Sequence, residues 1–348
     1  MLTDGLKPLL GTELPIIQAP MAGVQGSELA IAVCRAGGLG SLPCGMLTIE
    51  QILDETQRIR QATPRPYNLN FFCHSMPAYN TQIHARWQQC LAPYFDEVDE
   101  QCVPNPHGAS RMPFNHDIAD AIEPLRPPVI SFHFGLPERG LLKRVKSWGT
   151  RVLSSATTVE EARWLEANGA DAVIAQGSEA GGHRGMFLST DLSLQSPMST
   201  LVAQMVESVS IPVIAAGGIG NHRDVLQALA LGASAVQIGT SYMLCTEAKT
   251  SALHRAAIQD SKGGDTAITN IFSGRPARGI MNRAMTELGC INDLAPTFPY
   301  SSIEMGQLRG HFEKLGKSDF SPLWSGENMT GCKEVSAETL TRELAGLS

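Results

Sequence analysis

Residues 211–240 read IPVIAAGGIGNHRDVLQALALGASAVQIGT, and this stretch decides the fold. The apolar run Pro212–Ala216 ends in glycines, Arg223–Leu231 has the apolar spacing of a helix, and Ala235–Ile238 is a second apolar run. A strand, a helix and a strand in this order form a crossover unit, whose two strands lie parallel in one sheet. Both runs are almost entirely apolar, which is typical of strands buried on both faces.

The same alternation continues towards the N-terminus and predicts eight strands in all. The helical segments between them include Ser27–Ala36, Ile49–Ala62 and Val159–Asn168. The other six strands are predicted over Ile16–Ala19, Leu39–Leu42, Tyr67–Phe72, Val129–His133, Arg151–Ser154 and Asp171–Ala175. Eight such units favour a closed TIM (β/α)8 barrel. An open doubly wound sheet stays as the alternative, because periodicity does not report closure.

The remaining segments divide the chain into three predicted parts. We expect the barrel over residues 1–258, with a loop excursion over 75–127. Residues 259–314 are expected to form a smaller, mainly helical accessory segment that covers the substrate. The alternative for both insertions is a set of decorated loops without a core of their own. The tail, 315–348, ends in a predicted helix, Ala337–Leu347, that packs back on the barrel.

Composition excludes several classes of protein. The net charge is −7 and no basic run occurs, so a nucleic-acid partner is not expected. The N-terminal residues lack a signal pattern and no apolar stretch is long enough to span a bilayer. We therefore expect a cytoplasmic monomer or homodimer without a membrane partner. The eight cysteines include no C-x-x-C pair and no zinc-ligand spacing, so neither a metal nor a disulfide is predicted.

Glycine turns follow the last two predicted strands. Gly217 and Gly218 follow one of them, and Gly239 and Thr240 follow the other. Barrel enzymes often hold a phosphate at these two strand ends, where backbone N–H groups can approach an anion. The alternative is a pair of tight connections without a ligand. Gly38-Leu-Gly40 and Gly218-Ile-Gly220 each begin a dinucleotide-binding motif that neither completes, which disfavours that fold.

The segment Gln176–Gly185, QGSEAGGHRG, follows the sixth predicted strand. Four glycines surround His183 and favour a loop folded tightly around a ligand. Because histidine changes charge near neutral pH, His183 is a candidate for proton transfer or substrate contact. The alternative is a histidine on a flexible surface loop. Glu179 and Arg184 could anchor this loop through an ion pair.

Other predicted strand ends bring further groups to the same mouth. Met21-Ala22-Gly23 follows the first strand with small or adaptable side chains. Asn68 and Asn70 lie in the third strand on one face, where a buried amide needs a partner, and Asn70 can point into the mouth. His133 closes the fourth strand and is either a substrate contact or a hydrogen-bonded packing residue.

Several of these segments together resemble the nitronate monooxygenase family, formerly called 2-nitropropane dioxygenase. They are PIIQAPMAG at 15–23, NLNFF at 68–72, SFHFG at 131–135, the loop 176–185, AAGGI at 215–219, QIGT at 237–240 and SGRPAR at 273–278. The SFHFG segment points to the class that oxidises nitronates. The resemblance implies an FMN enzyme that uses O2 to convert alkyl nitronates, such as propionate 3-nitronate, into a carbonyl product and nitrite. Detoxification is the implied role.

By matching positions, the resemblance implies that His183 is catalytic. His133 and Arg184 are our candidates for substrate contacts. The resemblance also implies an FMN site made by Met21, Ala22, Gly23, Asn70, Gln176, Gly181, Gly217, Gly218, Gln237, Ile238, Gly239 and Thr240. Trp324-Ser325-Gly326 would contribute from the tail. Because the protein is acidic and the substrate anionic, we also expect a local cation among Arg184, Arg275 and Arg278.

Two other functions stay open at this point. An FMN-dependent NADH:quinone reductase or enoyl-thioester reductase would use the same barrel and phosphate turns, but would consume NAD(P)H. A flavin-binding barrel without catalysis would keep the glycine turns and would not require His183.

Overall fold

The computed structural model describes residues 6–105, 108, 111–261 and 265–347. An eight-stranded parallel sheet has the order β1-β9-β8-β6-β5-β4-β3-β2. Its two outer strands also meet, because Gln18 N and Leu39 N donate to Leu39 O and Ile16 O, each over 2.9 Å. The sheet is therefore a closed barrel, which confirms the predicted fold and excludes the open sheet.

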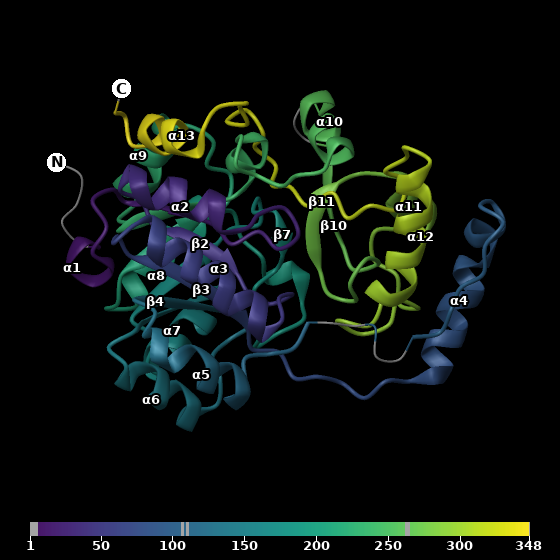
Figure 1. The fold of residues 1–348 in the computed structure, drawn as a ribbon, viewed down its shortest axis with the longest axis horizontal. Helices are drawn as coiled ribbons and strands as arrows, with labels where there is room; N and C mark the ends of the chain where they lie inside the picture. The colour runs from purple at the N-terminus through teal and green to yellow at the C-terminus, as the bar shows by residue number, and fades with distance from the viewer. Residues whose placement is uncertain (1–5, 106–107, 109–110, 262–264, 348) are drawn as a thin grey trace.

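The barrel strands coincide closely with the predicted ones. Their bounds are β1 Ile16–Gln18, β2 Gly40–Pro43, β3 Tyr67–Phe72, β4 Val129–His133, β5 Arg151–Ala156, β6 Ala172–Gln176, β8 Val213–Ala216 and β9 Ala235–Ile238. Helices on the outside of the barrel are α2 Ser27–Ala36, α3 Ile49–Ala62, α5 His116–Ile122, α6 Arg139–Ser147, α7 Val159–Ala167, α8 Met198–Ser208, α9 His222–Ala230 and α13 Ala337–Leu344 (Figure 1). The last of these, α13, packs on α2.

One end of the barrel is closed by the N-terminal segment. Leu6 and Leu10, at the short helix α1 (Lys7–Leu10), join a buried cluster with strand residues such as Ile17 and Leu153. Apolar side chains therefore fill this end. The opposite end, where the strands finish, is the one left for a ligand.

A second body lies to one side of the barrel (Figure 1). It contains α4 (Thr81–Asp96), β10 (Thr266–Thr269), β11 (Ala277–Ile280), α11 (Arg283–Glu287) and α12 (Ser302–Lys314). Its core joins α4 with residues 271–324 and includes Trp87, Leu91, Met305 and Phe312. We call this the accessory body. The two strands β10 and β11 were not predicted from the sequence.

The accessory body is connected to the barrel by a small sheet. Strand β11 pairs with β10 on one side and with β7 (Gly182–His183) on the other. The helix α10 (Ala252–Asp260) follows β9 and leads into the accessory body. Among the described helices, none combines the length and apolar character that a bilayer span requires.

Candidate active site

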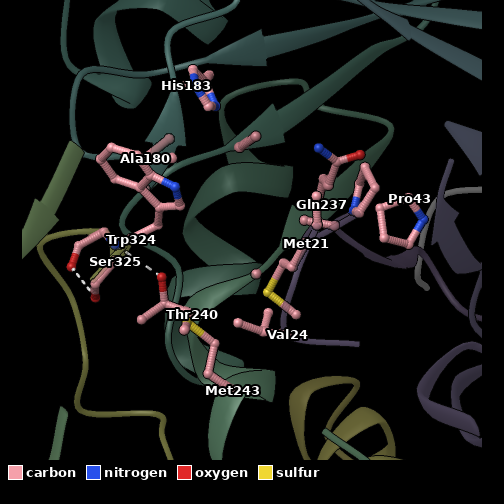
Figure 2. Close-up of a pocket in the computed structure, with 18 of the residues that line it drawn as sticks. Met21, Val24, Pro43, Ala180, His183, Gln237, Thr240, Met243, Trp324 and Ser325 are labelled. Atoms are coloured by element: carbon pink, nitrogen blue, oxygen red, sulfur yellow. Dashed lines mark hydrogen bonds between the residues drawn. The ribbon is translucent and has the colours of Figure 1, made fainter. Parts of the chain in front are cut away.

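A cavity of about 290 Å³ opens where the barrel strands end. Its lining combines residues in or just after the strands, such as Gln237 and Met21, with residues near or in the accessory body, such as His254 and Trp324. Figure 2 shows His183, Trp324 and Gln237 on different sides of this space. The cavity is therefore shared between the barrel and the accessory body.

Most of the residues predicted for the site line this one cavity. They are Met21, Ala22, Gly23, Asn70, His133, Gln176, Gly181, His183, Gly217, Gly218, Gln237, Ile238, Gly239 and Thr240. Arg184 is absent from this lining. The tail residues Trp324, Ser325 and Gly326 are part of it.

The loop that carries His183 is held in place by Gln176, at the end of β6. The Gln176 side chain donates from Nε2 to the His183 carbonyl (2.9 Å) and accepts at Oε1 from Gly185 N (2.7 Å). Gly182 has φ +73°, a conformation that favours glycine. The short strand pairing of His183 with Ala277 fixes the other side of the loop. His183 is thus part of an ordered structure, unlike a histidine on a flexible surface loop.

The His183 ring lies between a hydroxyl group and aromatic rings. Nε2 is 2.9 Å from Ser273 Oγ, and that hydroxyl donates to the Arg275 carbonyl over 3.3 Å. With its proton directed to the Arg275 carbonyl, the hydroxyl accepts from His183, and this assignment places the ring proton on Nε2 and a lone pair on Nδ1. The rings of Phe298 and Trp324 lie 5.4 and 5.5 Å from it, centroid to centroid.

Burial holds the pKa of His183 well below its usual range, and the nearby positive charges of Arg111 and Arg275 act in the same direction. A buried imidazolium near two guanidinium groups is unfavourable because it loses hydration and meets like charges. His183 is therefore neutral at pH 7, with an available lone pair.

Both ring nitrogens of His133 are already used within the protein. Nε2 is 3.1 Å from the His183 carbonyl, which can only accept, so this nitrogen carries the proton. Nδ1 is 3.0 Å from Ser155 Oγ and accepts from it. Burial lowers the pKa of His133 to about 4. The structure therefore places His133 at the cavity as a support for the backbone of His183.

Arg184 does not line the cavity, so it is not placed to contact a substrate there. Its side chain is fully buried, and its guanidinium donates to the carbonyls of Gln176, Gly177 and Ala180. The expected ion pair with Glu179 is also absent from the described residues, because the Glu179 carboxylate accepts from Met198 N. Arg184 anchors the loop through backbone carbonyls, which explains why it points inwards.

The two other cations expected near the substrate are also engaged elsewhere. Arg275 lies 3.9 Å above the Phe134 ring and donates to the Met186 carbonyl. Arg278 pairs with Glu327 over 3.0 Å. Neither is part of the cavity lining, which instead contains Arg111, Lys249 and Arg309. Arg111 lies in the long excursion after β3, and no sequence pattern identified it as a site residue.

The other end of the cavity is formed by glycine turns that approach each other closely. Gly217 and Gly218 have φ of +117° and +70°. A Cβ on Gly181 would lie 2.4 Å from Gly326 N, so side chains are excluded where these two loops meet. Thr240 Oγ1 accepts from Gly326 N over 3.0 Å, which brings the tail to the turn after β9.

Amide side chains line the space between these two ends. The Asn70 amide group donates to Ser131 Oγ (3.0 Å) and Ser131 O (3.2 Å), which leaves its oxygen as an unused acceptor. Gln237 Oε1 is buried and has no hydrogen-bond partner among the described residues. A buried polar atom without a partner is costly, so Gln237 favours a polar ligand here.

A closed (β/α)8 barrel with a ligand cavity at its strand ends defines an α/β-barrel enzyme. Residues 4–346 match the family model described as nitronate monooxygenase. A nitronate monooxygenase from Pseudomonas aeruginosa is 38% identical over 99% of this chain and 98% of its own length. One from Paraburkholderia phytofirmans is 35% identical over 97% of this chain and 93% of its own length. The chain therefore belongs to the nitronate monooxygenase family and is an oxidoreductase.

Solved structures give the same result for the fold. The nitroalkane oxidase from Streptomyces ansochromogenes is 38% identical and superposes with a TM-score of 0.87, covering 98% of this chain and 96% of that one. FabK from Thermotoga maritima is 27% identical, with a TM-score of 0.72 over 98% of this chain and 94% of that one.

Proposed function

We propose that this protein binds FMN and uses O2 to oxidise alkyl nitronates to a carbonyl product and nitrite. The observation that carries the proposal is the neutral His183 in the lining of a cavity that also contains Gln237, whose buried Oε1 has no hydrogen-bond partner among the described residues. Propionate 3-nitronate represents the substrate class, and removal of toxic nitronates is the expected role in the cell.

The residues at the glycine end fit the phosphate of FMN. Within the described chain, no hydrogen bond involves the backbone N–H of Gly218 or Gly239, and both residues line the cavity. Unpaired N–H groups next to a hydroxyl group such as Thr240 favour an anion. Gly181 and Gly217 would let the phosphate approach the backbone closely.

The residues in the middle of the cavity fit the flavin ring. The Asn70 oxygen and Gln237 Oε1 would meet polar atoms of the ring, and the backbone of Met21–Gly23 would lie beside it. FMN, when bound, would accept electrons from the nitronate and pass them to O2. The protein would orient the substrate next to the ring and limit its access to water.

His183 would handle the proton of the reaction. Because its pKa lies well below the usual range, the ring is neutral and could accept at Nδ1 the acidic proton of a neutral nitroalkane, which yields the nitronate. A nitronate has already lost this proton, so His183 would contact and orient it without a proton transfer. Ser273 would hold the proton on Nε2 and keep Nδ1 available. A neutral ring also avoids a fixed charge next to the reacting carbon.

Anaerobic mixing of the purified, flavin-containing protein with propionate 3-nitronate tests this function. We expect fast loss of oxidised-flavin absorbance with the nitronate, little change with NADH, and release of nitrite once O2 is admitted. Fast bleaching by NADH with no response to nitronate would instead establish a pyridine-nucleotide-dependent reductase. A protein that holds flavin and responds to neither would be the non-catalytic barrel.

Replacing His183 with asparagine tests the proposed role of that residue. We expect kcat/KM for the neutral nitroalkane to fall by roughly 10²- to 10⁴-fold, the usual contribution of a positioned acid or base, and kcat/KM for the nitronate to fall less, with flavin content unchanged. His116, an exposed histidine at the start of α5, provides the matched control, His116→Asn. Equal activity of the two variants would remove His183 from the mechanism.

A further inference from the structure

Three cationic side chains line the cavity, and they differ in their partners. Lys249 Nζ lies 3.1 Å from Glu28, and Arg309 Nε lies 2.7 Å from Glu313. Arg111 forms no ion pair with any carboxylate among the described residues. Within the described residues, its one side-chain hydrogen bond runs from Nη1 to Ser302 Oγ, over 2.8 Å.

The guanidinium of Arg111 is therefore left with unused donors and an unbalanced charge. Five N–H groups are available on an arginine, and Ser302 occupies one of them. Burial and the neighbouring charge of Arg309 lower the pKa of Arg111, although a guanidinium remains charged at pH 7. A largely desolvated charge without a counterion is costly for the folded protein, so an anion from outside would stabilise it.

Arg111 and His183 lie against the same aromatic ring. Both pack against the ring of Phe298: the Arg111 Cζ is 5.8 Å from the ring centroid and the His183 ring is 5.4 Å from it, centroid to centroid. Arg111 is also the strongest of the charges that act on His183. A short substrate can therefore meet both groups at once.

We infer that Arg111 binds a second anionic group of the substrate, a carboxylate carried on the same short carbon chain as the nitronate. This inference rests on the proposed function. It makes Arg111 the residue that selects carboxylate-bearing nitronates over plain alkyl nitronates. The planar fork of the guanidinium matches a carboxylate, which it can bind through two parallel hydrogen bonds.

The competing possibility is that Arg111 binds the nitronate itself, and two substrates separate the two roles. Propionate 3-nitronate carries the carboxylate, whereas butyl-1-nitronate has an ethyl group in its place. We expect Arg111→Gln to lower kcat/KM for propionate 3-nitronate by about 10- to 100-fold, as for loss of a charged hydrogen bond, and to change that for butyl-1-nitronate less than about twofold. Arg111→Lys should recover part of the loss.

Arg163, exposed on α7, supplies the control variant Arg163→Gln, which should leave both rates unchanged. Equal losses of both substrates in Arg111→Gln, or no loss of either, would overturn the inference. Flavin content, measured in each variant, shows whether the site remains folded.

Binding of succinate gives a readout that does not depend on turnover. Succinate has the shape and double charge of propionate 3-nitronate and cannot be oxidised in the same way. Calorimetry should show binding to the flavin-containing wild type and a Kd at least about 10-fold weaker for Arg111→Gln. If the wild type oxidises neither nitronate, the proposed function fails, while the succinate measurement still decides whether Arg111 binds a carboxylate. Equal succinate binding by both proteins would overturn the inference alone.

Discussion

The barrel and the accessory body fold by the same physical rules, but the barrel is much easier to recognise in the sequence than the accessory body. Each barrel strand is a short apolar run next to a helix of regular period, so the elements can be recognised one at a time. The accessory body joins α4 to residues 271–324 in one core. Its contacts link segments about 200 residues apart, which no local pattern reports.

The site divides in the same way. The residues at the strand ends, such as Gln176 and Gly218, were predicted because a barrel brings all its strand ends together. Ser273, Phe298 and Arg111 come from the accessory body or the excursion, and they surround His183 from the other side. The barrel thus supplies the expected cofactor positions, and the accessory body supplies the groups that we expect to tune the reaction.

The largest effect expected from this division concerns Trp87, a fully buried side chain on α4. Replacing it with alanine should destabilise the protein by about 3–5 kcal/mol, because a large cavity opens in the accessory core. Urea unfolding measures this difference. Trp164, an exposed tryptophan on the barrel helix α7, is the matched control, and Trp164→Ala should cost far less. Similar losses for the two variants would mean that α4 contributes little to the accessory core.

The next largest effect is expected from replacing Ser273, a residue of the accessory body whose hydroxyl group contacts His183. Ser273→Ala removes the acceptor for Nε2–H, so the ring can turn or change its tautomer. We expect kcat for the neutral nitroalkane to fall roughly 10-fold, as for the loss of one buried hydrogen bond, with little change in KM or flavin content. Ser273→Thr should restore part of the rate because it keeps the hydroxyl group. A change confined to KM would contradict a role in positioning the ring.

Predictions from the sequence were most accurate where a local pattern of residues has one common structural interpretation. The helices α2 and α3 match their predicted bounds, and the strands β3, β4 and β9 do as well. Arg184 shows the opposite case, because a cation next to a candidate catalytic histidine can bind substrate or hold its own loop. Whether its guanidinium points outwards or inwards depends on carbonyls at Gln176, Gly177 and Ala180, which only the folded loop brings within reach.

The smallest predicted effect concerns helix N-caps, one in the barrel and one in the accessory body. Thr48 caps α3 of the barrel, where its Oγ1 accepts from Gln51 N (3.2 Å), and Asn80 caps α4, where its Oδ1 accepts from Gln82 N (3.0 Å). Each cap satisfies a backbone N–H that the helix leaves unpaired, so Thr48→Ala and Asn80→Ala should each cost about 1 kcal/mol in urea unfolding.

Equal costs would show that the two regions are encoded equally well at the level of single helices. The accessory body would then be hard to recognise only because its core joins distant segments. A much larger cost for Asn80→Ala would contradict this view, since it would mean that α4 depends on its cap more than on packing against α12.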